Sequence, residues 1–293
     1  MRVIITGADS YIGSHIQSYI LSHDRTFSVE QLDVVDQKWQ DFDFSGYDAV
    51  VHVAAIVHRK DIADWDCYRR VNVDLTAAIA RKARSQGVRQ FVFLSSMAVY
   101  GAEKSLSAQK SVIAADAAPA PTTMYGRSKL LAEQALGEME SEGFRVAIVR
   151  PPNVYGPGCR GSYISTYAAI VAKLPAIPKA FSSVRQSVLY IDNLSRFIYL
   201  LICGQERGIY TPQDDISVSA VTLMEAIRDG LGLKRKTSAF LGAFVYLLAA
   251  CPLVRKGYGG ISYRRSDSHQ DRFDYVTVPF AEGIRRTVRN LRG

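Results

Sequence analysis

Thr6-Gly7-Ala8-Asp9-Ser10-Tyr11-Ile12-Gly13 is the stretch that decides the fold. It lies between a short β-branched run, Arg2 to Thr6, and a segment from Tyr11 to Leu21 whose apolar residues have helical spacing. Strand, glycine turn and helix in this order predict the opening of a dinucleotide-binding unit, in which amides at the start of the helix face a pyrophosphate. Gly7 permits the tight turn, and Gly13 lets helix and strand pack closely. Ser10 stands where a middle glycine is usual, so its side chain would crowd the phosphates unless its hydroxyl hydrogen-bonds to them.

An acidic residue follows the second predicted strand. This strand runs from Phe27 to Leu32 and ends at Asp33, twenty residues after Gly13. A carboxylate at this place accepts hydrogen bonds from the adenosine ribose and repels a 2′-phosphate, which predicts NAD rather than NADP. The alternative is a solvated acid in a turn.

Strands continue to alternate with helices along the chain. Buried strands are predicted at Ala49 to Ala54, Gln90 to Leu94 and Arg145 to Val149, and long helices at about Asp64 to Ser85 and Met124 to Ser141. This order predicts an α/β fold with a doubly wound parallel sheet of the Rossmann type, with ligands at the carboxyl ends of the strands. Residues 34–46 are short and polar, so we expect a third strand to be shortened or missing there.

A second, smaller part of the chain is expected after the run Arg150-Pro151-Pro152-Asn153-Val154-Tyr155-Gly156-Pro157, whose glycine and proline density indicates a crossover. A strand at Ser187 to Ile191 and a helix at Asp192 to Cys203 are expected to return to the sheet. We therefore predict a dinucleotide-binding domain over residues 1–157 and about 185–208. A C-terminal substrate-binding lobe is predicted over residues 158–184 and 209–293.

Tyr125 and Lys129 form a Y-x-x-x-K pair. Residues four positions apart on a helix lie on the same face, one turn apart. An ammonium group beside a phenol favours the phenolate, so the pKa of Tyr125 is expected to fall from about 10 towards the range of a base at neutral pH. Such a base suits proton transfer to or from a sugar hydroxyl, although the spacing also occurs by chance on exposed helices.

Composition sets broad limits on function. The 293 residues carry 36 lysines and arginines against 28 acidic residues, a net charge of +8 that attracts anions such as nucleotide diphosphates. The basic residues are not interleaved with aromatic residues in a nucleic-acid-binding motif, so no nucleic-acid partner is expected. The four cysteines form no C-x-x-C pair, and neither a disulfide framework nor a metal site is expected. The first residues lack the long apolar run of a signal peptide, and we predict a cytoplasmic protein.

One apolar stretch stands apart, from Ala239 to Val254, with Lys234-Arg235-Lys236 before it and Arg255-Lys256 after it. Its sixteen residues are fewer than the roughly 20 of a membrane-spanning helix. The first interpretation is a buried helix or a subunit contact, and the alternative is attachment to a membrane surface.

Taken together, these motifs resemble the extended short-chain dehydrogenase/reductase family, and within it the NAD-dependent epimerases and dehydratases of the UDP-glucose 4-epimerase type. The resemblance rests on T-G-x-x-x-x-I-G, the strand-end Asp33, H-V-A-A at His52 to Ala55, S-S-M-A-V-Y-G at Ser95 to Gly101, and Y-x-x-x-K, in that order. It is strong up to about Pro157 and patchy afterwards.

The resemblance implies roles for individual residues. Tyr125 would be the catalytic acid/base, Lys129 would lower its pKa and hold the nicotinamide ribose, and Ser96 would hydrogen-bond the reacting oxygen. Asn153 and Arg185 would contact the substrate sugar and its diphosphate, with Ser96 also in the substrate site; Arg264 and Arg265 are candidates for a second diphosphate contact. The implied NAD contacts are Gly7, Ser10, Tyr11, Ile12, Gly13, Asp33, Ala54, Ala55, Tyr125, Lys129 and Pro152.

The serine motif separates branches of the family. Sugar 4,6-dehydratases carry an Asp-Glu pair directly after the serine or threonine, whereas this chain has Met97 and Ala98, neither of which can move a proton. Dehydration is therefore not expected.

The resemblance implies a nucleotide-sugar 4-epimerase acting on UDP-glucose, UDP-galactose or their N-acetyl derivatives. Tyr125 would take the proton of the 4-hydroxyl while hydride passes to NAD, and the resulting 4-keto sugar would turn and receive the hydride on its other face. One alternative is an NAD(P)H-dependent reductase of a nucleotide-linked 4-keto-6-deoxy sugar, which needs the same three side chains. Another is an NAD-binding regulator without catalysis. The resemblance also implies a homodimer built through the two long helices.

Overall fold

The computed structural model describes residues 1–57, 64–114, 116–159 and 163–291. Its main sheet has the strand order β10-β6-β4-β3-β1-β2, and every neighbouring pair is parallel. The strands are β1 (Arg2–Thr6), β2 (Ser28–Leu32), β3 (Ala49–His52), β4 (Gln90–Leu94), β6 (Arg145–Val149) and β10 (Gly208–Tyr210). The predicted doubly wound parallel sheet is confirmed.

The strand order reverses at β1, whose neighbours are β2 on one side and β3 on the other. Residues 34–46 hold no strand; they form a short 3-10 helix, Gln37–Gln40, and bury Trp39 and Phe44 against the sheet. The expectation of a missing third strand is therefore confirmed. In sheets of this kind ligands bind where the order reverses, so the site is expected at the carboxyl ends of β1 and β3.

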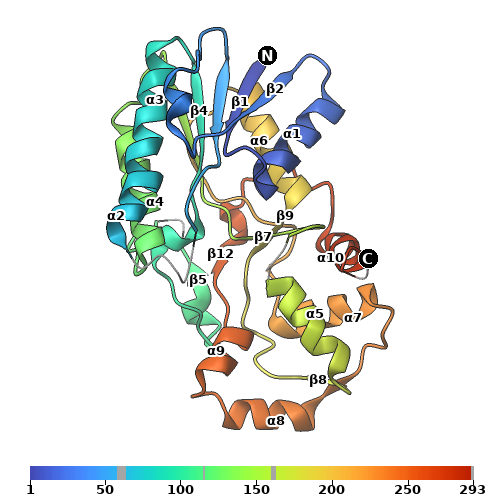
Figure 1. The fold of residues 1–293 in the computed structure, drawn as a ribbon. Helices are drawn as coiled ribbons and strands as arrows, with labels where there is room; N and C mark the ends of the chain where they lie inside the picture. Colours follow the sequence, from blue (N-terminus) through green and yellow to red (C-terminus); the bar gives the residue numbers. More distant parts are fainter. Residues whose placement is uncertain (58–63, 115, 160–162, 292–293) are drawn as a thin grey trace.

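Helices cover both faces of the sheet (Figure 1). On one face lie α1 (Tyr11–His23) and α6 (Ile191–Cys203), and on the other lie α2 (Trp65–Tyr68), α3 (Leu75–Ser85) and α4 (Met124–Gly137). A π-helical segment, Arg69–Asp74, joins α2 to α3, so the long helix predicted over 64–85 is present with one widened turn. Because side chains of a strand alternate between faces, Ile5 enters the core under α1 and α6, while Ile4 enters the core under α3 and α4.

The remaining elements form the lobe at the other end of the molecule (Figure 1). Its short parallel strand pairs are β7 (Asn153–Tyr155) with β9 (Val188–Tyr190), β8 (Ile177–Pro178) with β11 (Thr237–Ser238), and β5 (Val112–Ile113) with β12 (Ser262–Tyr263). Its helices are α5 (Tyr163–Lys173), α7 (Ala220–Gly230), α8 (Ala239–Leu247), α9 (Pro252–Tyr258) and α10 (Phe280–Arg289).

Two sequence-based expectations are wrong here. The strand predicted at Ser187 to Ile191 does not join the main sheet, because Pro151 and Pro152 end β6 without amide donors and the chain starts a separate ladder in which β9 pairs with β7. The sixth strand of the sheet is β10 instead. The apolar stretch Ala239 to Val254 is also not a buried helix, since Gly242 is the only buried residue of α8. The division into two domains stays a prediction.

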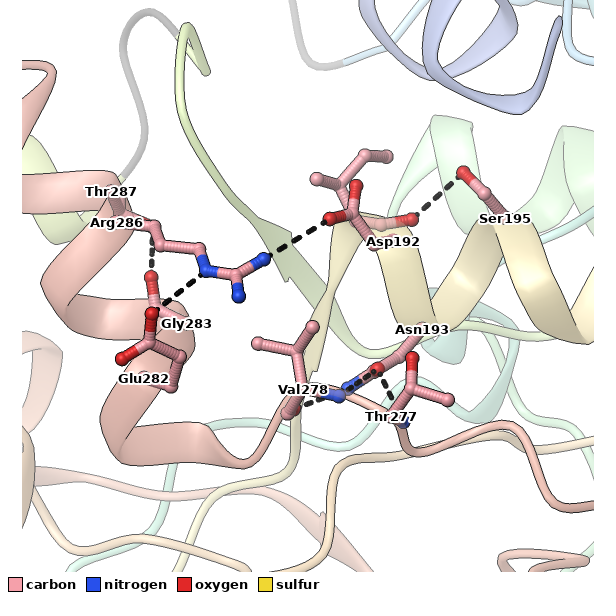
Figure 2. A network of polar contacts seen from close by, with 10 residues as sticks. Asp192, Asn193, Ser195, Thr277, Val278, Glu282, Gly283, Arg286 and Thr287 are labelled. Atoms are coloured by element: carbon pink, nitrogen blue, oxygen red, sulfur yellow. Dashed lines mark hydrogen bonds and ion pairs between the residues drawn. The ribbon is translucent and has the colours of Figure 1, made fainter. Parts of the chain in front are cut away.

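Figure 2 shows how the lobe is joined to the sheet through α6. The Asn193 side chain is fully buried, and its Oδ1 accepts from the amides of Thr277 (3.1 Å) and Val278 (3.0 Å). Its Nδ2 donates to Val278 O and to Asp214 Oδ1, both at 2.9 Å. One amide side chain therefore satisfies backbone groups of the segment that leads into α10.

We expect the Asn193→Ala variant to lose about 2–4 kcal/mol of unfolding free energy, because the buried amide of Val278 loses its acceptor and the buried carbonyl of Val278 loses its donor. Urea unfolding would measure the loss. The matched control is Arg286→Ala in the same network, where the partly exposed ion pair with Asp192 (3.9 Å) is worth about 0–1 kcal/mol. Equal losses in the two variants would contradict the role given to Asn193.

Candidate active site

The glycine turn closes tightly against the end of β3. Gly7 has φ +94°, and a Cβ built on it would lie 3.0 Å from the amide nitrogen of Ala54. A side chain at Gly7 would therefore be strained by its backbone and crowded by its neighbour. The structure brings the predicted contacts Gly7, Ala54 and Ala55 together at the carboxyl ends of β1 and β3.

Ser10 does not crowd this turn. Its backbone is extended, and its hydroxyl oxygen accepts from the amide of Gly13 at 3.2 Å, so Ser10 is the N-cap of α1. A Cβ on Gly13 would lie 2.7 Å from that hydroxyl oxygen, which gives Gly13 a second reason to be glycine. No oxygen among the described residues accepts from the amides of Tyr11 and Ile12. Two free amides at a helix N-terminus fit a dinucleotide diphosphate.

Asp33 lies where the sequence placed it, directly after β2 and exposed. Its Oδ1 accepts from the amide of Val35 at 2.9 Å, which leaves Oδ2 for a ligand. The neighbouring Gln31 accepts from the amide of Asp9 at 2.8 Å and so ties the glycine turn to the end of β2. The carboxylate and the free amides thus lie on one edge of the sheet, as a dinucleotide requires.

Tyr125 and Lys129 lie on the inner face of α4, where they are 9% and 1% exposed. The phenol of Tyr125 hydrogen-bonds with Ser96, which follows β4. The Lys129 ammonium donates to the carbonyl of Leu94 at 2.8 Å and lies 4.5 Å from the centre of the Phe93 ring. The catalytic candidates are therefore at the carboxyl end of β4.

The pKa values of this pair differ from the expectation. Burial raises the pKa of Tyr125 to about 12, and the hydrogen bond with Ser96 lowers it only in part. Burial also lowers the pKa of Lys129 to about 7, against the attraction of Glu133. Burial therefore opposes the expected priming of Tyr125 by a charged Lys129, because removal from water disfavours both the phenolate and the ammonium.

Four predicted site residues share one cavity of about 360 Å³, namely Ser96, Tyr125, Pro152 and Asn153. Met97 and Ala98 line it as well, and Lys104 is the only charged residue in its wall among those that the structure describes. Gln186 also lines it, with a side-chain oxygen that is buried and has no hydrogen-bond partner among the described residues. A polar ligand could satisfy this oxygen.

Arg185, Arg264 and Arg265 do not line this cavity. All three are exposed, and the carbonyl of Arg185 packs against Gly260. The residue next to Arg185, Gln186, takes the place in the wall that the sequence assigned to the arginine. No sequence pattern singled out Gln186 or Lys104, since both come into the cavity through loops.

A buried ion pair behind the cavity was also missed. Arg150 donates through Nε (3.0 Å) and one terminal nitrogen (2.6 Å) to the two oxygens of Glu133, and both side chains are almost fully buried. Its other terminal nitrogen donates to the Tyr100 hydroxyl at 2.8 Å, and the Ser95 hydroxyl donates to Glu133. Glu133 lies four residues after Lys129 on α4, so helical spacing could have placed it beside the catalytic pair.

The side chain of Asn72 connects two segments next to the site. In the π-helical segment its Oδ1 accepts from the Ile56 amide (2.8 Å), and its Nδ2 donates to the Ile56 carbonyl and the Ser128 hydroxyl (both 2.9 Å). The side chain thus ties the loop after β3 to α4.

A larger open groove of about 670 Å³ lies elsewhere, at the amino end of β6, lined by charged residues that include Arg145, Glu206 and Arg272. This is the opposite edge of the sheet from the turn, so it has no part in the site. Among the described residues no three His, Cys, Asp or Glu side chains gather as metal ligands would.

The shifted pKa of Lys129 predicts a pH dependence of stability. Its pKa is about 7 in the folded protein and about 10.4 in an unfolded chain, so between these values only the unfolded chain binds the proton. The unfolding free energy of the wild type should therefore rise relative to that of Lys129→Met as pH increases from about 7 to 9, by up to about 1.4 kcal/mol per pH unit. Urea unfolding at pH 7, 8 and 9 would measure the difference.

The matched control is Lys38→Met, whose side chain is 89% exposed and should give a difference that does not change with pH. If the difference in unfolding free energy between the wild type and Lys129→Met also does not change with pH, then Lys129 keeps its charge in the folded protein.

Comparison with known proteins adds to this geometry. N-acetyl-alpha-D-glucosaminyl-diphospho-ditrans,octacis-undecaprenol 4-epimerase of Escherichia coli O157:H7 is 27% identical over 240 residues, which are 74% of this chain and 69% of that protein. UDP-glucose 4-epimerase of Vibrio cholerae is 31% identical over 52% of this chain and 46% of that protein. GDP-6-deoxy-D-mannose reductase of Pseudomonas aeruginosa is 28% identical over 71% of this chain and 73% of that protein.

Solved structures share the fold along the whole chain. UDP-glucose 4-epimerase of Thermus thermophilus in complex with NAD superposes with a TM-score of 0.72 at 21% identity, covering 100% of this chain and 99% of that one. A family model described as the NAD dependent epimerase/dehydratase family matches residues 3–202, which hold the glycine turn, Ser96, Tyr125 and Lys129. The chain belongs to the NAD-dependent epimerase/dehydratase family.

Proposed function

We propose that this protein is an NAD-dependent 4-epimerase of a nucleotide sugar such as UDP-glucose or its N-acetyl derivative. The observation that carries the proposal is the shared cavity, in which Ser96 and Tyr125 face the same space as Asn153. This cavity includes Ser96 at the carboxyl end of β4, and the same edge of the sheet carries the free amides of α1 and the Asp33 carboxylate, which fit NAD. The cofactor, when bound, would supply the acceptor and donor for the hydride at C4 of the sugar.

The residues of the chain hold the sugar and move its proton. Tyr125 would exchange a proton with the 4-oxygen, and Ser96, already hydrogen-bonded with the phenol, would hold that oxygen as hydroxyl and as ketone. A phenol with a pKa near 12 suits donation to the 4-oxygen. Taking the proton needs a cation near the phenolate, and Lys129 on the next turn is the residue for that task.

The residues that line the cavity do not favour a dehydration reaction. Met97 and Ala98 line it directly after Ser96, where loss of water would need an acid and a base. The presence of both Tyr125 and Lys129 likewise favours an enzyme over an NAD-binding regulator.

A second candidate is an NAD(P)H-dependent reductase of a nucleotide-linked 4-keto-6-deoxy sugar. The observation that favours it is the similarity to a GDP-6-deoxy-D-mannose reductase over 71% of the chain. Both reactions use the same three side chains, but only the reductase consumes a cofactor at each turnover.

We also propose a homodimer through α3 and α4, which lie side by side on the outside of the sheet domain (Figure 1). Leu130 and Leu131 on α4 are half-buried in the single chain and are available for such a contact.

The test incubates the purified protein with UDP-galactose or UDP-N-acetylgalactosamine and no added cofactor. We expect the C4 epimer to form, with NAD carried by the protein, and Tyr125→Phe to lower the rate by about 10²–10⁴-fold while NAD stays bound, since the proton carrier is lost. The matched control Tyr199→Phe removes a phenol that donates to Asp24 at 3.0 Å, outside the cavity, and should keep the rate.

If the protein turns over only when NADH and a 4-keto sugar are added, the reductase replaces the epimerase as the proposed function. Full activity of Tyr125→Phe would remove that residue from either mechanism.

The choice of NAD over NADP can be tested by binding alone. Asp33→Ala should weaken NAD binding about tenfold, because the charged acceptor for the ribose hydroxyls is lost. The variant should also show a smaller ratio of NAD affinity to NADP affinity, because the carboxylate no longer repels the 2′-phosphate of NADP. Calorimetric titration of both cofactors measures this. Asp36→Ala, an exposed acid of the same loop that caps a 3-10 helix, is the control and should change neither affinity. An unchanged preference in Asp33→Ala would contradict the role of Asp33.

A further inference from the structure

Helices α8 and α9 lie at the far end of the lobe (Figure 1). Large apolar side chains are exposed on and next to these two helices. We call this group the apolar end face; its members are Phe240, Phe244, Leu247, Leu248 and Leu253. Leu247 is 81% exposed, Leu253 76% and Phe240 72%. Exposed large apolar side chains are ordinary when scattered, but a contiguous group marks a surface that binds something.

The inner side of α8 explains why the outer side is free. Gly242 packs directly on the backbone of Lys179, where a Cβ would lie 2.2 Å from the carbonyl oxygen. The Phe181 amide donates to the Tyr246 hydroxyl at 3.0 Å, and their rings are 4.5 Å apart. These contacts hold the helix to the lobe with its opposite face, so Phe240, Phe244 and Leu247 point away from it.

Basic residues surround the apolar end face. Lys234 and Lys236 precede it, Arg255 and Lys256 follow it, and Lys179 lies beneath α8; all five are exposed. Among the described residues no carboxylate lies within ion-pair distance of these five side chains. The nearby Asp229 is already paired with Arg235. No acidic or basic residue interrupts the chain from Thr237 to Val254.

We propose that the apolar end face docks on an anionic membrane surface, with its leucine and phenylalanine side chains in the headgroup region and its lysines and arginines on the lipid phosphates. Within the described residues no helix is long and apolar enough to cross a membrane, so the contact is with one surface of the bilayer. An apolar patch rimmed by unpaired cations has the composition of such a contact, because the two attractions act together.

Charge decides between a membrane and a second copy of the chain. A symmetric contact between two apolar end faces would bring the cations of one copy against those of the other. Like charges brought together at an interface oppose association, whereas anionic lipids attract every one of them.

The apolar end face also adjoins the cavity. Lys104, the charged residue of the cavity wall, donates to the carbonyl of Lys256 at 3.1 Å, near the end of α9. Resting on the proposed function, this predicts that a sugar diphosphate whose other end is a membrane lipid can reach Ser96 and Tyr125 while its lipid stays in the bilayer. The diphosphate would then lie by Lys104.

The test measures co-sedimentation of the full chain with phosphatidylcholine vesicles that contain phosphatidylglycerol, and with vesicles of phosphatidylcholine alone. We expect binding to the anionic vesicles. The double variant Leu247→Ser, Leu253→Ser should lower the affinity about tenfold or more, because it removes the two most exposed apolar side chains of the face. Lys234→Gln and Lys236→Gln should each lower it about fivefold on anionic vesicles.

The matched control is Ile209→Ser, an apolar side chain that is 50% exposed on β10 at the edge of the main sheet, and it should bind as the wild type does. All variants should turn over a water-soluble UDP-sugar at the wild-type rate, so a failure of the membrane proposal is separate from a failure of the proposed function. The proposal is overturned if the wild type does not bind anionic vesicles, or if the double leucine variant binds them as well as the wild type does. It is also overturned if the double variant converts a dimer of the protein into monomers and leaves vesicle binding unchanged.

Discussion

The site depends on the buried ion pair between Arg150 and Glu133. It joins the end of β6 to the middle of α4, and through Ser95 and Tyr100 it reaches the segment after β4. The carbonyl of Arg150 also accepts from the Tyr263 hydroxyl at 2.9 Å, which brings in the lobe. A buried charge without its partner is strongly destabilising, so these four elements hold one arrangement. That arrangement is what sets Tyr125 opposite Ser96.

Around this pair, burial shifts the pKa values of several ionisable groups towards their uncharged forms. His52 is fully buried between the hydroxyls of Thr6 (2.6 Å) and Thr76 (2.9 Å), and burial lowers its pKa to about 3. The same loss of water moves the pKa values of Lys129 and Tyr125 towards their uncharged forms. Groups buried in this way interact strongly with any charge that a ligand brings close to them, because the effective dielectric constant around them is low. Catalysis would then depend on which charges enter the cavity with the substrate and cofactor.

The two ends of the molecule differ in character. The sheet and its helices bury their apolar sides against one another, while the lobe combines short strand pairs with helices and leaves α8 with one buried residue. In the wall of the cavity, Asn153 and Gln186 lie at the strand pair of β7 and β9, while Ser96 follows β4 and Tyr125 lies on α4. On the proposed function, the first two residues would contact the sugar and the other two would handle its 4-oxygen.

The sequence by itself determined the parallel sheet, the glycine turn, the missing third strand and the pairing of Tyr125 with Lys129, because all of these are written in local patterns of period, turn residues and helical spacing. It could not place the groups that meet through distant segments. Arg185 and Gln186 are neighbours, yet only the packing of the lobe turned the glutamine into the cavity and the arginine to solvent. Likewise the sixteen apolar residues from Ala239 had the composition of a buried helix. Whether a neighbouring element covers such a helix is decided by tertiary contacts, and here the contacts at Gly242 and Tyr246 hold one side and leave the other exposed.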